Sequence, residues 1–170
     1  MPENLIAFIT KLSQPFPRFD DRMKTWFRTN LWIISLVMAI IAGLDALYLL
    51  GNFLNTLRAM AMYDSAVAMY YGGGSSIVGF LRLHLIVSML VAVGTTVLLG
   101  VATAGLKQQT QTGWFLLAIT LLILTGFGII GVLLDVILAP ALMVTPFLTV
   151  LGGLAMLYVT GQVSDQFTKK

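Results

Sequence analysis

The chain has 170 residues, of which 58% are hydrophobic and 10% are charged, and its formal net charge is +3. A soluble domain carries about 25% charged residues, so this deficit indicates a surface that largely faces lipid. The absence of cysteine excludes disulfides, thiolate metal sites and thiol catalysis, and the single histidine excludes a bis-histidine haem site within one chain. We therefore expect no metal and no cofactor.

Residues 1–30 are predicted to lie along the membrane surface as an amphipathic segment. Pro15 and Pro17 end a first helix because neither has an amide donor, and Asp20 and Asp21 suit the start of the next helix. The apolar stripe of the first helix has helical period and consists of Leu5, Phe8, Ile9 and Leu12. This pattern favours a lipid-anchoring segment, with a partner-docking surface as the alternative.

The first predicted membrane span covers residues 31–52 and is followed by a segment without transmembrane character, residues 53–71. The span is apolar except for Ser35 and Asp45, and its small face consists of Ser35, Ala39, Gly43 and Ala46. Because residues 53–71 are mostly good helix formers, the first helix either extends beyond the membrane or lies along its surface. The glycine-rich stretch 72–76 predicts a flexible turn.

The second predicted span, residues 77–106, is the helix around which the bundle is organised. It has no ionisable residue from Leu85 to Leu106. A ridge of small residues recurs at every fourth position, at Ser88, Ala92, Thr96, Gly100 and Ala104. In lipid such small residues allow close helix approach, since no hydrophobic effect drives helices together there. We predict that this ridge packs against helices of this chain or of another subunit.

Two further spans complete the predicted fold. A polar loop at 107–113 leads to a third span, 114–139, and a fourth span covers 142–163. Pro146 suits the first turn of the fourth span, where its missing amide costs little. Residues 164–170 are expected to form a short, solvated cytoplasmic tail. The fold class is therefore an all-α integral membrane protein, a four-transmembrane-helix bundle with an N-terminal amphipathic interfacial helix (spans 31–52, 77–106, 114–139 and 142–163).

The distribution of basic residues predicts the orientation of the chain. Four spans place both termini on one side, and that side carries eight of the ten Lys and Arg residues, namely Lys11, Arg18, Arg22, Lys24, Arg28, Lys107, Lys169 and Lys170. The three tryptophans are expected at the same interface, at Trp26, Trp32 and Trp114. The positive-inside rule then predicts cytoplasmic termini, in a bacterial inner membrane or its organelle equivalent.

A polar cluster is predicted in the outer third of the bilayer. Its members come from three spans and are Asp45, Arg82, His84 and Asp135. Charges at that depth face inward and find partners because they are otherwise costly. The cluster is interpreted either as a structural clamp, with Arg82 held between carboxylates, or as an ion relay or a site for a quinone or lipid headgroup. The nearby methionines Met60, Met62 and Met69 give only a weak indication of Cu(I) binding.

The sequence contains no catalytic motif, and the membrane topology already accounts for its basic residues, so neither an enzyme nor a nucleic-acid-binding protein is expected. The favoured function is a non-catalytic integral subunit or accessory protein of a larger membrane complex. The alternative is a small oligomeric ion- or proton-coupled transporter or channel. The expected partners are the lipid bilayer and other membrane subunits or further copies of the chain.

Overall fold

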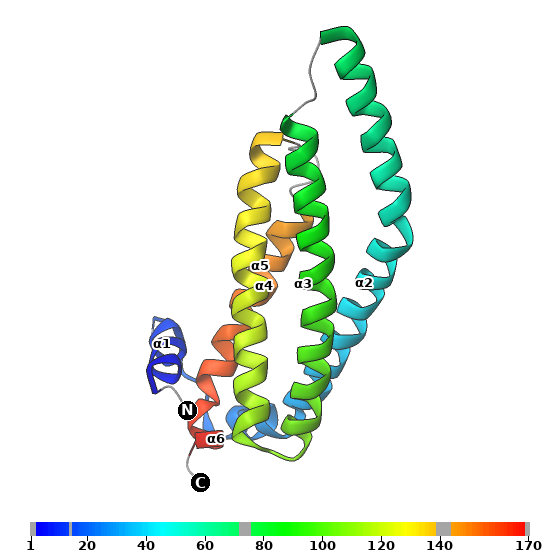
Figure 1. Ribbon diagram of the computed structural model, residues 1–170. Helices are drawn as coiled ribbons and strands as arrows, with labels where there is room; N and C mark the ends of the chain where they lie inside the picture. Colours follow the sequence, from blue (N-terminus) through cyan, green and yellow to red (C-terminus); the bar gives the residue numbers. More distant parts are fainter. Residues whose placement is uncertain (1–2, 14, 72–75, 139–143, 169–170) are drawn as a thin grey trace. The chain divides into compact units, whose positions relative to one another are not determined.

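The computed structural model describes residues 3–13, 15–71, 76–138 and 144–168 (Figure 1). All regular structure within these ranges is helical. In chain order the helices are α1 (Glu3–Ser13), α2 (Asp21–Tyr71), α3 (Ser76–Lys107), α4 (Gln111–Leu138), α5 (Val144–Gln162) and α6 (Ser164–Thr168). The predicted all-α class is therefore confirmed. Residues 72–75 of the predicted glycine-rich turn lie outside the described residues.

Three helical stretches in the described ranges are long and apolar enough to cross a membrane, which indicates a multi-pass membrane protein. They are Asp21–Gly51, Ile86–Lys107 and Gln111–Leu134. The shortest has 22 residues and is about 33 Å long at about 1.5 Å per residue, which is enough to cross a hydrocarbon core of about 30 Å. These stretches correspond to the first three predicted spans. Because α2 continues to Tyr71, the first helix extends well beyond its spanning stretch.

The chain forms two compact units. The first consists of Met1–Met38 with Val97–Lys170, and the second consists of Ala39–Thr96. Helices α2 and α3 each contribute residues to both units. The first unit contains α1, α4, α5 and α6, so it contains both ends of the chain.

The start of α2 is fixed by a side-chain cap. The Asp20 carboxylate accepts a hydrogen bond from the backbone N–H of Met23 at 2.7 Å, which satisfies a donor that has no partner within the helix. Helix α1 ends at Ser13, so both predicted boundaries are confirmed. Helix α2 then passes through Leu31 without a break. The later part of the predicted surface segment and the first span are therefore one helix.

Helices α4 and α5 pack closely because glycines of α4 face side chains of α5. A Cβ atom added to Gly131 would lie 3.0 Å from Cβ of Pro146, and one added to Gly128 would lie 3.0 Å from Cγ2 of Val150. The pairing of later α4 residues with earlier α5 residues makes the two helices antiparallel. Close backbone approach through small residues is the packing typical of membrane helices.

The connection between α3 and α4 is a tight turn. Gln109 has a φ of 55°, in the left-handed region, and the backbone N–H of Thr110 bonds to the carbonyl of Gly105 at 2.9 Å. This pattern ends a helix by pairing carbonyls that would otherwise have no partner. The Thr110 hydroxyl accepts from the backbone N–H of Gly113 at 3.2 Å, so it also caps α4. The connection is shorter than the predicted loop, 107–113.

The expectation of a solvated tail is wrong for residues 164–168, which form α6. Phe167 is only 4% exposed, and Ser164 is buried. The Ser164 hydroxyl donates to the carbonyl of Gly161 at 2.8 Å. The tail is ordered because this bond satisfies a carbonyl at the end of α5 while Phe167 buries its ring.

Candidate functional site

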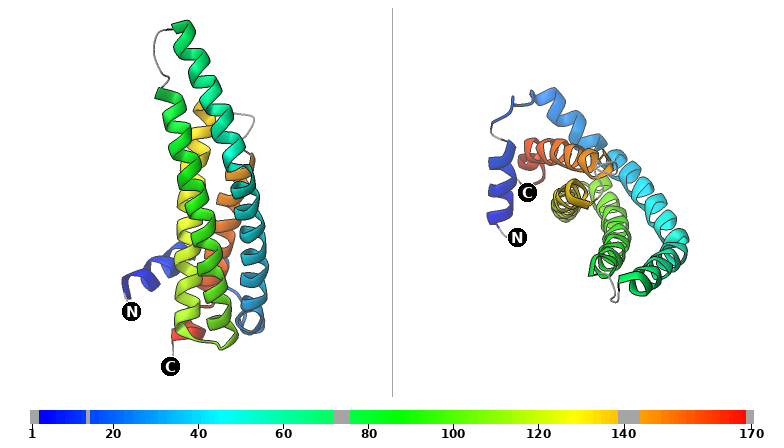
Figure 2. Two further views of the ribbon diagram at one scale, coloured as in Figure 1. Left: turned by 45° about the vertical axis from the view of Figure 1, so that its right-hand side comes forward. Right: turned by 90° about the horizontal axis from the view of Figure 1, so that it is seen from above.

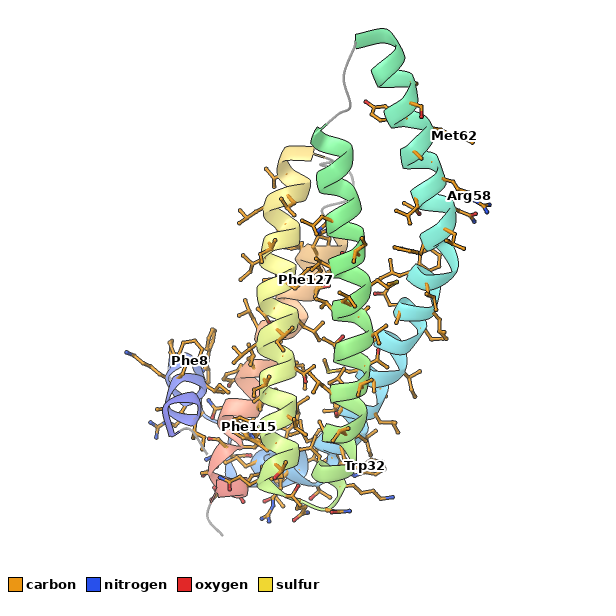
Figure 3. The ribbon with its side chains drawn as sticks, in the orientation of Figure 1. Phe8, Trp32, Arg58, Met62, Phe115 and Phe127 are labelled. Carbon is orange, nitrogen blue, oxygen red and sulfur yellow. The ribbon has the colours of Figure 1, made fainter. Side chains whose placement is uncertain are left out.

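The N-terminal helix packs on the C-terminal membrane helix. Figures 1 and 2 show α1 (blue) beside α5 (orange to red), and Figure 2 shows α1 running across the direction of α4. A Cβ added to Gly161 of α5 would lie 3.0 Å from the Ile9 carbonyl oxygen and from Cβ of Ser13. Ile9 is fully buried, whereas Phe8 is 50% exposed (Figure 3). The predicted apolar stripe is therefore divided between α5 and the surface, with the Leu5 and Leu12 side chains outside the described residues.

Gln162 ties α5 to the connector between α1 and α2. Its Oε1 accepts from the backbone N–H of Phe19 at 3.3 Å, and its Nε2 donates to the carbonyl of Ser13 at 3.4 Å. The residue is 8% exposed. A buried side-chain amide without hydrogen bonds is costly. These two bonds pair its oxygen and its nitrogen with backbone groups at the two ends of the connector.

A cluster of aromatic side chains packs around the same connector. The Tyr158 hydroxyl donates to the carbonyl of Pro17. The Tyr158 ring lies 5.3 Å from the rings of both Phe16 and Phe19, measured between centroids, and Phe19 stacks on Phe27 at 5.1 Å. Such pairs each contribute about 0.5–1.5 kcal/mol beyond the area they bury. The connector is therefore held by α5 as well as by the two helices that it joins.

Charged residues also lie where the start of α2 meets the C-terminal end of the chain. Lys24 Nζ lies 3.4 Å from Asp165 Oδ2, with side chains that are 21% and 41% exposed. At that exposure the ion pair contributes at most about 1 kcal/mol. Arg28 Nε and Asp165 Oδ1 are buried atoms without a hydrogen-bond partner among the described residues. Lys24 is therefore the cation that joins α2 to α6 in the described residues.

Trp114 is a buried structural residue, and its place at the membrane interface stays a prediction. Its side chain is fully buried, and its indole Nε1 donates to the carbonyl of Thr160 at 3.0 Å. That carbonyl is in the last turn of α5, where no helical donor remains for it. Trp26 is 56% exposed, and the ring of Trp32 lies 5.5 Å from Lys107 Nζ.

The small face predicted for the first span is confirmed. Ser35, Ala39 and Ala46 are buried, and a Cβ added to Gly43 would lie 3.4 Å from Cγ2 of Thr96. The Ser35 hydroxyl donates to the carbonyl of Leu99 at 3.3 Å. Small residues thus bring α2 close enough to α3 for a hydrogen bond between the helices.

The small-residue ridge of α3 is not packed along its whole length by this chain. Gly100 and Ala104 are exposed, and a Cβ added to Gly100 would meet no heavy atom within 4 Å. The buried positions instead alternate by three and four residues and are Ala92, Thr95, Leu99, Ala102 and Leu106. A strict four-residue repeat drifts about 40° around a helix at each step. This chain therefore does not itself cover Gly100 and Ala104, and their contact with another subunit stays a prediction.

The predicted polar cluster is only partly described. Asp45 is exposed on α2, and His84 is half-buried on α3. The side chains of Arg82 and Asp135 lie outside the described residues, so their pairing stays a prediction.

The weak indication that methionines bind Cu(I) is not tested by the structure. Met62 is 75% exposed and projects outward from α2, as does Arg58 (Figure 3). The side chains of Met60 and Met69 lie outside the described residues. Among the residues that the structure describes, no group of three His, Cys, Asp or Glu side chains is placed to hold a metal ion.

The contacts that join the two ends of the chain have no recognisable signal in the sequence. Gln162 and Tyr158 lie in the fourth predicted span and look there like isolated polar residues near a membrane interface. Their partners are backbone groups more than 130 residues away in the sequence, as the Gln162–Phe19 separation of 143 residues shows. Comparison with protein-family models, with curated proteins and with solved structures finds no match to this chain.

Proposed function

We propose that this chain is a non-catalytic integral subunit or accessory protein of a larger membrane complex, which it joins through an outward face of α3. That face, here called the α3 outer face, consists of exposed residues that are small or β-branched, namely Val93, Gly94, Val97, Gly100, Val101 and Ala104. The single observation that carries the proposal is the open space above Gly100, in the middle of this face.

The composition of the α3 outer face favours a protein neighbour over lipid. Small residues let the backbone of a second helix approach closely, and dispersion contacts and weak hydrogen bonds then stabilise the pair. The exposed face of α4 differs because it is dominated by large side chains, such as Ile129, Ile130 and Leu133. Gly126 is the open exception there. The contrast between α3 and α4 supports assigning the docking surface to α3.

The proposal includes α5 as the fourth membrane span. Helix α5 has 19 residues, about 28 Å at about 1.5 Å per residue, which is close to the thickness of the hydrocarbon core. Its apolar stretch Pro146–Gln162 packs antiparallel to α4. Four spans place both termini on one side, and the excess of basic residues there favours the cytoplasm. On this topology α1 and the start of α2 lie at the cytoplasmic interface as a surface anchor.

A second candidate function rests on Asp45. This carboxylate is exposed in the middle of exposed apolar neighbours, which include Leu44 and Tyr48, within a membrane-spanning stretch. An ionisable residue in that place usually faces a water-filled path or a partner charge. An oligomeric ion- or proton-coupled transporter would supply such a path between subunits.

Native mass spectrometry of the protein extracted gently from its source membrane distinguishes these functions. The proposal predicts a stoichiometric complex with at least one different membrane subunit. Homo-oligomers alone, combined with ion flux in reconstituted vesicles that Asp45→Asn abolishes, would support the transporter instead. A chain that is monomeric under every gentle extraction condition would contradict both functions.

A further inference from the structure

The first turns of α2 carry a shallow groove that the proposed docking function does not use. It is lined by two rows of residues, each spaced by four positions: Asp21, Thr25 and Thr29 in one row, and Arg22, Trp26 and Asn30 in the other. Residues four apart form a ridge on a helix surface, so the groove runs along the helix between two such ridges. Most of the lining residues are exposed, and Trp26 is 56% exposed.

The row that begins with Asp21 presents hydrogen-bond acceptors. The hydroxyl of Thr25 donates its hydrogen to the carbonyl of Asp21 at 2.8 Å, and that of Thr29 donates to the carbonyl of Thr25 at 2.9 Å. Each hydroxyl has one hydrogen, so only oxygen lone pairs remain available to a ligand. The cap of α2 is made by Asp20, which leaves the Asp21 carboxylate without a partner among the described residues.

The row that begins with Arg22 presents mainly donors. The Arg22 guanidinium has no ion-pair partner among the described residues, and the exposed Trp26 adds an indole N–H. Asn30 uses one amide hydrogen on the carbonyl of Trp26 at 2.8 Å and keeps the other. The wall of the groove is mainly apolar, and its polar groups form an accepting row with a negative end and a donating row with a positive end, which begin at adjacent residues.

We propose that this groove binds the headgroup of a zwitterionic phospholipid that bears a primary ammonium group. The ammonium fits the Asp21 row, which offers only acceptors, and the phosphate fits Arg22, whose guanidinium binds phosphate oxygens in pairs. A purely anionic headgroup fits less well because it would lie against the Asp21 carboxylate.

The direction of the groove matches the direction of a lipid molecule. The charged pair Asp21 and Arg22 comes first, the amphipathic Trp26 follows one turn later, and the apolar run begins at Leu31. Tryptophan is enriched where headgroups meet hydrocarbon. A phospholipid with its headgroup at the charged pair therefore extends its acyl chains along the apolar part of α2.

The test is lipid binding to the purified full-length chain, measured by native mass spectrometry. The probes are phosphatidylethanolamine, phosphatidylcholine and phosphatidylglycerol with identical acyl chains. We expect phosphatidylethanolamine to bind about tenfold more tightly than phosphatidylcholine, whose quaternary ammonium has no N–H to donate. Asp21→Ala should remove this preference, and Arg22→Gln should weaken the binding of all three lipids.

The matched control is Arg18→Gln, because Arg18 is also an exposed cation but lies outside the groove. It should leave the preference unchanged. Equal affinities for the three lipids, tightest binding of phosphatidylglycerol, or equal losses in Arg18→Gln and Arg22→Gln would each overturn the proposal. Melting temperatures of all variants, which change only exposed side chains, should stay near that of the unmodified chain and show that each is folded.

Discussion

The indole of Trp114 and the carbonyl of Thr160 join α4 to the last turn of α5 by a hydrogen bond of 3.0 Å. Both residues are fully buried. The bond lies at the end of the α4–α5 pair opposite to Gly131 and Pro146, whose close contact fixes the other end. The two helices are therefore held at both ends, by a polar bond at one and by backbone approach at the other.

Trp114→Phe should lower the stability of the solubilised protein by about 1–3 kcal/mol. The change leaves the Thr160 carbonyl buried without a donor and removes apolar contact. Thermal unfolding followed by circular dichroism measures the effect. The control is Trp26→Phe at an exposed position, and equal melting temperatures for the two variants would contradict the structural role of Trp114.

Gly113→Ala should also destabilise the protein. A Cβ added at the facing Gly105 would lie 2.7 Å from Cα of Gly113, so neither position has room for a side chain without moving backbone. Gly126→Ala is the matched control because its Cβ would meet nothing within 4 Å. There the change removes the helix penalty of glycine, about 0.5–1 kcal/mol. The account fails if the melting temperatures of the two variants shift in the same direction by the same amount.

Gln162→Leu should loosen the N-terminal segment while leaving the spans intact. The variant leaves the Phe19 N–H without this acceptor and removes a bond to the Ser13 carbonyl. Hydrogen–deuterium exchange should show faster exchange in residues 6–20, by about fivefold or more, for a loss of about 1 kcal/mol or more. Gln166→Leu, at a half-exposed position of α6, serves as the control. Unchanged exchange in Gln162→Leu would show that the aromatic contacts alone hold the segment.

Arg82 and Asp45 are predicted to interact across helices, with Asp135 as the alternative partner of Arg82. If they pair, the double variant Arg82→Met with Asp45→Leu should be less destabilised than the sum of the two single variants, because a lone charge at membrane depth costs more than none. The measurement is folded yield and melting temperature for the four proteins of the cycle. Strict additivity would exclude the Asp45 pair and direct the same cycle to Asp135.

Hydropathy and local motifs were sufficient to predict most of the helices. The apolar runs predict spans because any spanning chain must satisfy its backbone internally. The capping role of Asp20 and the small face around Ser35 could also be predicted from the sequence, since both depend on residues that are close together in the chain. Those features follow from helix geometry without knowledge of the partner helix.

The contacts between distant segments were not predictable in the same way. The stripe containing Ile9 shows that one face of α1 is buried but does not identify α5 as the surface that covers it. Trp114 lies at the end of a predicted span, where tryptophans often face the membrane interface. Only its contact with Thr160 in the structure shows that its side chain is buried. A four-residue repeat such as the ridge through Gly100 looks aligned in the sequence but turns around the helix, so the sequence does not show which of its residues the chain itself covers.

The most direct test of the proposed docking face compares Gly100→Leu with Gly126→Leu. Both glycines are exposed on spanning helices, and both have open space where a side chain would begin. The measurement is the mass of the complex extracted gently from the source membrane, together with the melting temperature of the isolated chain. The account predicts that Gly100→Leu removes the partner subunit and that Gly126→Leu keeps it. Neither isolated chain should melt below the unmodified one, because each change replaces an exposed helical glycine by a better helix former. Retention of the partner by Gly100→Leu would contradict the assignment of the α3 outer face.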